Sequence, residues 1–194
     1  MADRETSDAE LLALIEDPRA FESFYRRHLE ALLRFATRRC RSPEEAAELV
    51  SVVFLEVRTG ASGYDRRRGG ARPWLLGIAT HCLADLRGER ARAVDAERRL
   101  GGMAQLDANE YAEIDARIDA ERLYPRLERA LARLSPGDRD LLLLVEREGL
   151  KPSEAARALG IRPVTARVRL LRARRKLHAE LAGRVERALP RRAI

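Results

Sequence analysis

Apolar residues recur every three or four positions along most of the chain, which is the spacing of one face of an α-helix. The repeat is almost continuous over residues 11–36. Ser42 and Pro43 then have the composition of a helix start, and Glu45 completes a capping box with Ser42. A second apolar stripe follows over residues 46–57. The pattern predicts helices over both segments, preceded by a polar tail over residues 1–9.

The regular pattern is interrupted twice. Residues 59–70 are rich in glycine and end in a basic cluster, which predicts a loop before a helix that opens at Pro73 and runs out near Gly88. Residues 91–121 contain two adjacent glycines and become acidic, so we interpret them as a flexible linker with marginal helix at its ends. We therefore expect an all-α protein with two small helical bundles, over residues 10–90 and 122–194, joined by the flexible acidic linker 91–121.

Composition supports the helical prediction. Hydrophobic residues make up 45% of the 194 residues and charged residues 36%, mostly Leu, Ala, Arg and Glu, which lose little side-chain freedom in a helix. The net charge is +7, and the positive charge is concentrated near the end of the chain, where residues 152–192 hold twelve Lys or Arg against three acidic residues. A basic segment favours polyanionic partners through counterion release, although membrane surfaces and solubility also fit.

Several classes of function are excluded or disfavoured by what the sequence lacks. There is no HExxH, GxSxG or phosphate-binding glycine loop, and the three histidines are far apart, so we predict no enzyme, no metal site and no cofactor. Cys40 and Cys82 lack metal-ligand spacing and are interpreted as small buried groups in a reducing compartment. The start of the chain is acidic and polar, and no apolar run approaches the roughly 20 residues that span a bilayer. We expect a cytoplasmic protein without membrane insertion.

The strongest local signal is LKPSEAARALGIRPVTARVRLLRARRKL, residues 150–177. Ala155 and Ala156 allow a second helix to cross closely, and Gly160-Ile161 supplies a tight turn with an apolar plug. One inner stripe then continues along the second helix at Ala166, Leu170, Ala173, Leu177 and Leu181. This arrangement is typical of a helix-turn-helix, whose second helix enters the major groove of DNA.

The opposite face of that second helix is predicted to bind DNA, because arginine bonds guanine bidentately or holds phosphate. The candidate residues are Arg162, Thr165, Arg167, Arg169 and Arg172, with Lys176 further along. Phosphate contact is favoured from Arg172 onward, because only the start of a recognition helix reaches the bases. The alternative is a solvated basic helix within a bundle. Val164, Val168 and Leu171 form an apolar stripe, which indicates either a protein contact or locally adjusted packing.

Residues 129–181 resemble the C-terminal promoter-binding domain of extracytoplasmic-function (ECF) sigma factors. The LxxLxxxxRxxLLL pattern of that family is matched by Leu131, Leu134, Arg139 and the leucine run that begins at Leu141 and ends at Leu144. Residues 20–40 and 42–57 resemble the family's core-polymerase-binding helices, and residues 64–92 resemble its minus-ten-reading segment. The resemblance implies an alternative sigma factor whose partners are core RNA polymerase and promoter DNA. We further expect that an anti-sigma protein, where one exists, wedges between the two bundles, because the long linker lets them separate.

The resemblance assigns roles to particular residues. Minus-ten recognition is expected from Arg66, Arg67, Arg68, Arg72, Trp74, Thr80, His81, Asp85 and Arg87. Contact with core polymerase is expected from Glu48, Leu49, Ser51, Val52 and Glu56. The sequence departs from the family at Ser51-Val52, where Gln-Glu is usual, and at His81, where Asn is usual. The competing hypothesis is a helix-turn-helix regulator that acts without a sigma role.

Overall fold

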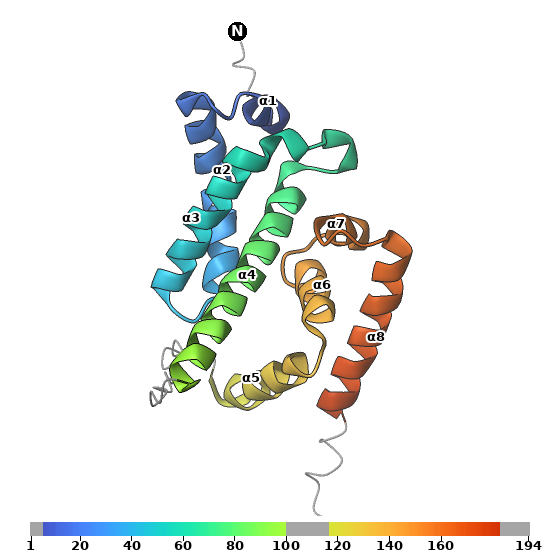
Figure 1. Cartoon of the computed structure of the whole chain (residues 1–194). Helices are drawn as coiled ribbons and strands as arrows, with labels where there is room; N and C mark the ends of the chain where they lie inside the picture. Colours follow the sequence, from blue (N-terminus) through green and yellow to red (C-terminus); the bar gives the residue numbers. More distant parts are fainter. Residues whose placement is uncertain (1–5, 100–116, 183–194) are drawn as a thin grey trace, which may run out of the picture. The chain divides into compact units, whose positions relative to one another are not determined.

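The computed structural model describes residues 6–99 and 117–182, and every regular element within these two ranges is a helix. The chain divides into two compact units, one built around α1 to α4 and the other around α5 to α8 (Figure 1). The prediction of an all-α protein with two helical bundles is therefore confirmed. Most of the predicted linker, residues 100–116, lies outside the described residues.

Helical structure in the first unit begins at Asp8, within residues 1–9, which were predicted to form a polar tail. α1 spans Asp8–Ala13, because Ser7 and Glu10 form a capping box in which each side chain accepts from the backbone N–H of the other, at 3.4 and 2.8 Å. Leu11 and Leu12 of this helix are buried. α2 follows over Pro18–Thr37, with Asp17 as its N-cap.

α3 spans Pro43–Gly60 and starts where the sequence predicts. Ser42 accepts from the Glu45 N–H at 3.3 Å, while the Glu45 carboxylate accepts from the backbone N–H of Arg41, one residue before the usual partner. α2, α3 and α4 lie side by side (Figure 1). Their facing sides form the core of the unit, whose largest fully buried side chains are Phe24, Leu32, Phe35, Leu49, Val53, Val57, Leu75 and Leu76.

α4 spans Ala71–Arg99 and is longer than the predicted helix. The prediction that it ends near Gly88 is wrong. One glycine costs a helix only about 1 kcal/mol, and the Glu, Arg and Ala residues after it are strong helix formers. Arg90 also ties this stretch to α3, pairing with Glu45 and with Glu48, the latter at 2.8 Å.

The second unit contains α5 (Arg117–Ala132), α6 (Pro136–Glu146), α7 (Pro152–Ala158) and α8 (Pro163–Ala182). Ser135 caps α6 and Pro136 occupies its first turn, so the polar break between α5 and α6 is itself a helix start. α8 packs against both α5 and α6. The core between them includes Leu141, Leu144, Leu170 and Ala173.

Cys40 and Cys82 are free thiols. Burial, with the nearby carboxylates of Glu56 and Asp85, raises the pKa of Cys82 to about 11, so this thiol stays protonated and unreactive at neutral pH. Over the two described ranges, every helix is too short or too polar to cross a membrane.

Candidate nucleic-acid and polymerase interfaces

The predicted helix-turn-helix is present between α7 and α8. The turn contains Gly160, whose φ of 66° lies in the left-handed region that favours glycine. The Ile161 N–H closes the turn by donating to the Ala156 carbonyl at 2.9 Å. Ala155 and Ala156 are completely buried, as the crossing of two helices requires. The turn therefore fixes the direction in which α8 leaves α7.

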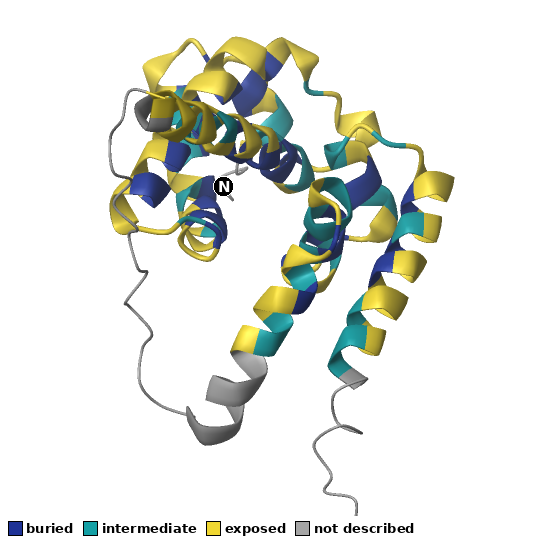
Figure 2. Cartoon of the chain, turned by 60° about the horizontal axis from the view of Figure 1, so that its bottom comes forward, coloured by how far each residue is buried: buried dark blue, intermediate teal, exposed yellow. Residues whose placement is uncertain are grey.

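One face of α8 is buried and the opposite face is exposed, as Figure 2 shows. Ala166, Leu170 and Ala173 are at most 3% exposed, which confirms the predicted inner stripe. Successive residues of a helix are rotated by about 100°, so the positions directly opposite this stripe are Val164, Val168, Leu171 and Arg175. The predicted line of Thr165, Arg169, Arg172 and Lys176 lies about a quarter turn away from the stripe, at the side of the helix.

This offset explains why Arg169 is not presented to solvent as predicted. Its Nε donates to Asp138 Oδ1 at 2.5 Å, and both side chains are only 30% exposed. Gly137 leaves room for the guanidinium, since a Cβ there would lie 2.7 Å from Arg169 Nη2. Partial burial raises the pKa of Asp138, but hydrogen bonds from Ser135 and Arg169 and the charges of Arg169 and Lys176 outweigh it and leave the pKa below its ordinary value. Arg169 is therefore held within its own unit.

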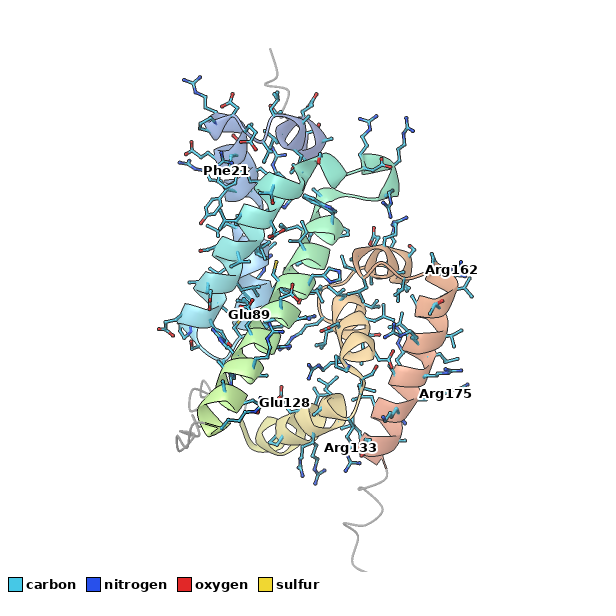
Figure 3. All side chains as sticks on the ribbon, in the orientation of Figure 1. Phe21, Glu89, Glu128, Arg133, Arg162 and Arg175 are labelled. Carbon is cyan, nitrogen blue, oxygen red and sulfur yellow. The ribbon has the colours of Figure 1, made fainter. Side chains whose placement is uncertain are left out.

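Other side chains at the sides of α8 also form hydrogen bonds or ion pairs within the second unit. Lys176 Nζ donates to the Arg133 carbonyl at 2.7 Å, and Arg174 donates to Glu146 through Nε and Nη2 at 2.8 and 2.6 Å. Arg133, the first residue after α5 (labelled in Figure 3), pairs at 2.6 Å with Glu180, which is near the far end of α8. These contacts hold the flanks of α8 against α5 and α6 and leave only its outer side for a partner.

Four arginines are available around that outer side, with Arg175 on it, Arg167 and Arg172 at its two edges and Arg162 just before the helix. Arg162, Arg167 and Arg172 are exposed, as predicted, together with Thr165. Arg175 is exposed as well but is absent from the predicted set, and Figure 3 labels it together with Arg162. None of these arginines pairs with a carboxylate among the residues that the structure describes. Arg175 lies directly opposite the buried stripe, and this position in the helix repeat, not its charge, is the sequence signal that indicates it.

The predicted basic loop is folded around Tyr64. η1 (Ala61–Gly63) and η2 (Arg66–Arg68) are single 3₁₀ turns, and Asp65 caps η2 by accepting from the Arg67 N–H at 2.9 Å. The Tyr64 ring lies 5.3 Å from that of Trp74, and its hydroxyl donates to the Gly69 carbonyl at 3.3 Å. Gly69 has a φ of 151°, which only glycine adopts readily at its ψ. The loop is therefore ordered, with Arg66 to Arg68 exposed on its outside.

The predicted minus-ten residues of α4 do not share one surface. Trp74 is half-buried, and His81 and Asp85 are exposed on the same face of the helix. Thr80 is buried and donates to the Leu76 carbonyl at 2.8 Å, so its side chain is not presented to DNA. Arg87 donates to the Arg39 carbonyl at 2.8 Å, which ties α4 to the end of α2. Arg72 is exposed at the start of α4.

A groove of about 540 Å³ between α3 and α4 joins two of the predicted sites. It is lined by Val52 and Glu56 of α3 and by Ile78, His81, Cys82, Asp85, Leu86 and Glu89 of α4. Its apolar side chains are therefore bordered by three carboxylates. His81 and Asp85 lie with two predicted polymerase residues, an association that sequence spacing alone does not reveal.

The remaining polymerase candidates lie along α3. Glu48 is exposed and pairs with Arg90, and Ser51 is exposed with its hydroxyl donating to the Ala47 carbonyl at 2.9 Å. Leu49 is completely buried in the core. Its apolar position fits the helix repeat, so the structure gives its side chain a packing role rather than a surface for polymerase.

Comparison with known proteins agrees with both units. The family model for Sigma-70 region 2 matches residues 24–93, and the model for Sigma-70 region 4 matches residues 125–177. These two regions define the class, the sigma-70 family of transcription initiation factors.

Curated relatives narrow the class. The chain is 31% identical over 182 residues to the ECF RNA polymerase sigma factor SigM of Mycobacterium tuberculosis (strain ATCC 25618 / H37Rv), covering 92% of this chain and 86% of SigM. It is 31% identical over 177 residues to the ECF RNA polymerase sigma factor SigK of Mycolicibacterium vanbaalenii, covering 87% of this chain and 89% of SigK. The chain belongs to the ECF sigma factors and is an alternative sigma factor that directs transcription initiation, not an enzyme.

Solved structures share the fold. CnrH in complex with the cytosolic domain of CnrY is 24% identical with a TM-score of 0.61, and the match covers 92% of this chain and 99% of CnrH. The sigma factor RpoE in complex with the anti-sigma factor NepR, from Bartonella quintana, is 21% identical with a TM-score of 0.58, covering 83% and 96% of the two chains.

Proposed function

We propose that the two units divide promoter recognition between them. α8 lies in the major groove of the minus-thirty-five duplex, while the unit of α1 to α4 binds core polymerase and the opened minus-ten strand. The observation that carries this proposal is the outer face of α8, where Arg162, Arg167, Arg172 and Arg175 are exposed beyond the residues that tie the helix to α5 and α6.

The position of each cation along α8 suggests its contact. Arg162, Thr165 and Arg167 stand at the start of the helix, the part that reaches base edges in a helix-turn-helix. Arg172 and Arg175 lie about two turns further along, where a recognition helix leaves the groove floor and meets phosphate. Phosphate neutralisation by these arginines supplies affinity through counterion release, and the first turn supplies sequence preference.

We assign the minus-ten contacts by charge. Arg66 to Arg68 bind the backbone of the opened strand, and Arg72 stands at the same end of α4. The carboxylates of the α3–α4 groove repel phosphate but accept hydrogen bonds from the amino groups of bases, so His81 and Asp85 contact bases rather than backbone. Trp74 is partly exposed beside Tyr64 and offers a stacking surface. Thr80 and Arg87 act through packing and helix docking.

We assign the polymerase contact to the exposed residues Glu48, Ser51 and Glu56 of α3, together with the half-buried Val52. Arg90 pairs with Glu48 on this face, whereas Glu56 lies with two further carboxylates in the groove, so the part around Glu56 is suited to a cationic surface of the polymerase. Val52 replaces the polar residue usual in the family and adds apolar area beside Glu56 in the groove. Leu49 supports the face from beneath.

The proposed roles of the two units imply the partners of this chain. CnrH is bound to the cytosolic domain of CnrY and RpoE to the anti-sigma factor NepR, and we include an anti-sigma protein among the partners of this chain beside core polymerase and promoter DNA. All of these partners place its action in the cytoplasm.

The experiment that tests the division uses holoenzyme reconstituted from core polymerase and the full chain, on a promoter from which it initiates. Arg66, Arg67 and Arg68 are replaced together by Ala. We expect duplex binding to be retained while unpaired thymines around minus-ten react less with permanganate, because the strand is held less well. Normal strand opening by this variant would contradict the minus-ten assignment.

A further inference from the structure

The outermost side chains at the start of α8 are apolar. Val164 is 70% exposed, Val168 44% and Leu171 50%, and they lie directly opposite the buried stripe. Adjusted packing, one of the two readings of this stripe, is therefore excluded. Valine is also a poorer helix former than Ala, Leu or Arg, so helix stability does not account for its presence at two exposed positions.

The surroundings of this apolar stripe indicate an anionic partner. Arg162 precedes it, Arg167 and Arg172 flank it on either side, and Arg175 follows it. The only acidic residue of α8 is Glu180, which is near the far end and pairs with Arg133. A matching partner is apolar at its centre and negative at both edges. The major groove at A·T pairs meets this description, because thymine methyl groups lie on its floor between two phosphate backbones.

The length of the stripe also fits this partner. Val164, Val168 and Leu171 follow one another at four- and three-residue steps, so they extend over roughly 10 Å of helix at 1.5 Å per residue. Base pairs are stacked about 3.4 Å apart, so the stripe matches about three consecutive pairs. Its first two members stand in the part of a recognition helix that reaches base edges.

We propose that Val164, Val168 and Leu171 read the methyl groups of thymines in the minus-thirty-five element. The inference rests on the proposed placement of α8 in the major groove and adds what is recognised there. The promoters of this sigma factor then carry A·T pairs in at least two of three consecutive positions under the stripe, and apolar contact replaces arginine–guanine pairing as the source of specificity at these positions.

The test uses holoenzyme and the strongest promoter from which it initiates, with each minus-thirty-five thymine replaced in turn by deoxyuridine. Deoxyuridine lacks only the C5 methyl group and keeps every hydrogen-bonding group. We expect at least two replacements to lower affinity by about fourfold each, equivalent to ~0.8 kcal/mol at 1.4 kcal/mol per tenfold change. Deoxyuridine placed outside both promoter elements is the control and is expected to have no effect.

A variant then assigns the effect to the stripe. Val168→Thr keeps the side-chain shape but replaces a methyl group by a hydroxyl, and the exposed position makes loss of folding easy to exclude by circular dichroism. For this variant we expect that, at one thymine, replacement by deoxyuridine lowers promoter affinity by less than twofold. Val94→Thr makes the same change at an exposed position of α4 and should keep the wild-type sensitivity.

The inference is overturned if deoxyuridine has no effect throughout the element, if the element lacks adjacent A·T pairs, or if Val168→Thr keeps full sensitivity. A variant that instead loses affinity for core polymerase identifies the stripe as a protein contact. In each case promoter binding by the α8 arginines can persist, and its salt dependence tests the proposed function separately.

Discussion

At the scale of residues, charge alone does not identify which side chains of α8 are exposed and available to DNA. Arg167 and Arg169 are two positions apart, yet Arg167 is exposed and Arg169 is paired with Asp138 at 2.5 Å. A helix turns by about 100° per residue, so two neighbouring arginines on a basic helix point to different surroundings. One is available to a partner and the other stabilises the domain.

We predict different effects for the two alanine variants. Arg167→Ala should leave thermal stability unchanged and flatten the dependence of log affinity on log salt concentration by about one, because it removes a cation that displaces counterions from the DNA. Arg169→Ala should keep the wild-type salt dependence and lower stability by about 1 kcal/mol, since it removes a partly exposed ion pair. Thermal unfolding and promoter titrations at several salt concentrations measure both. Identical salt effects for the two variants would contradict the assignment.

Asp138 gives the second unit a defined response to acid. Its pKa is lower in the folded state than in the unfolded chain, so its contribution to stability is present above the ordinary carboxyl pKa and is lost as the pH falls through the lower folded value. We predict that Asp138→Asn is less stable than wild type at neutral pH and that this difference shrinks as the pH is lowered into the acid range. Unfolding at a series of pH values tests this. A difference that grows in acid would show that the pKa is not lowered.

At the scale of elements, α3 and α8 carry opposite surfaces. α8 presents arginines around an apolar stripe, whereas the exposed side of α3 near the groove presents Glu48 and Glu56. α4 joins the two kinds of surface, because Arg66 to Arg68 precede its first turn and the acidic groove follows along its side. On the proposed assignments, the helices separate contacts with nucleic acid from contacts with a cationic protein surface.

We predict that Glu56→Arg weakens association with core polymerase by on the order of tenfold, since it places like charges together across the interface. Glu128→Arg makes the same change at an exposed position of α5 and should have no effect. Co-purification or fluorescence titration with core polymerase measures both variants. Equal affinities for the two would exclude this part of α3 from the contact.

At the scale of the whole molecule, the order of the helices was predictable from the sequence. The contacts between helices were predictable only in part. Helical periodicity, the Ser42 cap and the turn at Gly160 predict the two bundles and the helix-turn-helix, because these signals are local in the chain. Ion pairs between elements are not local. Without knowing that Arg90 meets α3 or that Asp138 meets Arg169, sequence reasoning ends α4 too early and places Arg169 on the exposed face of its helix.

Burial accounts for the other differences. Leu49 and Thr80 match the family pattern, but their side chains lie in the core and shape the unit rather than touch a partner. Conversely, the exposure of Arg175 and the lining of the α3–α4 groove depend on which helix faces pack against one another, so the structure reveals them and the sequence does not. Resemblance thus predicts which segments carry function, and packing decides which side chains within them are available.

The central claim is that α8 binds promoter DNA through its outer face while the other unit binds polymerase. The most direct measurement is the salt dependence of promoter binding by holoenzyme carrying Arg162→Ala, Arg167→Ala, Arg172→Ala and Arg175→Ala together, with Arg174→Ala as the matched control. For the fourfold variant we predict that the slope of log promoter affinity against log salt concentration is flatter by about 3 to 4, while its association with core polymerase is unchanged. For the control we predict a slope close to that of the wild type. A fourfold variant that keeps the wild-type slope and promoter affinity would contradict the account.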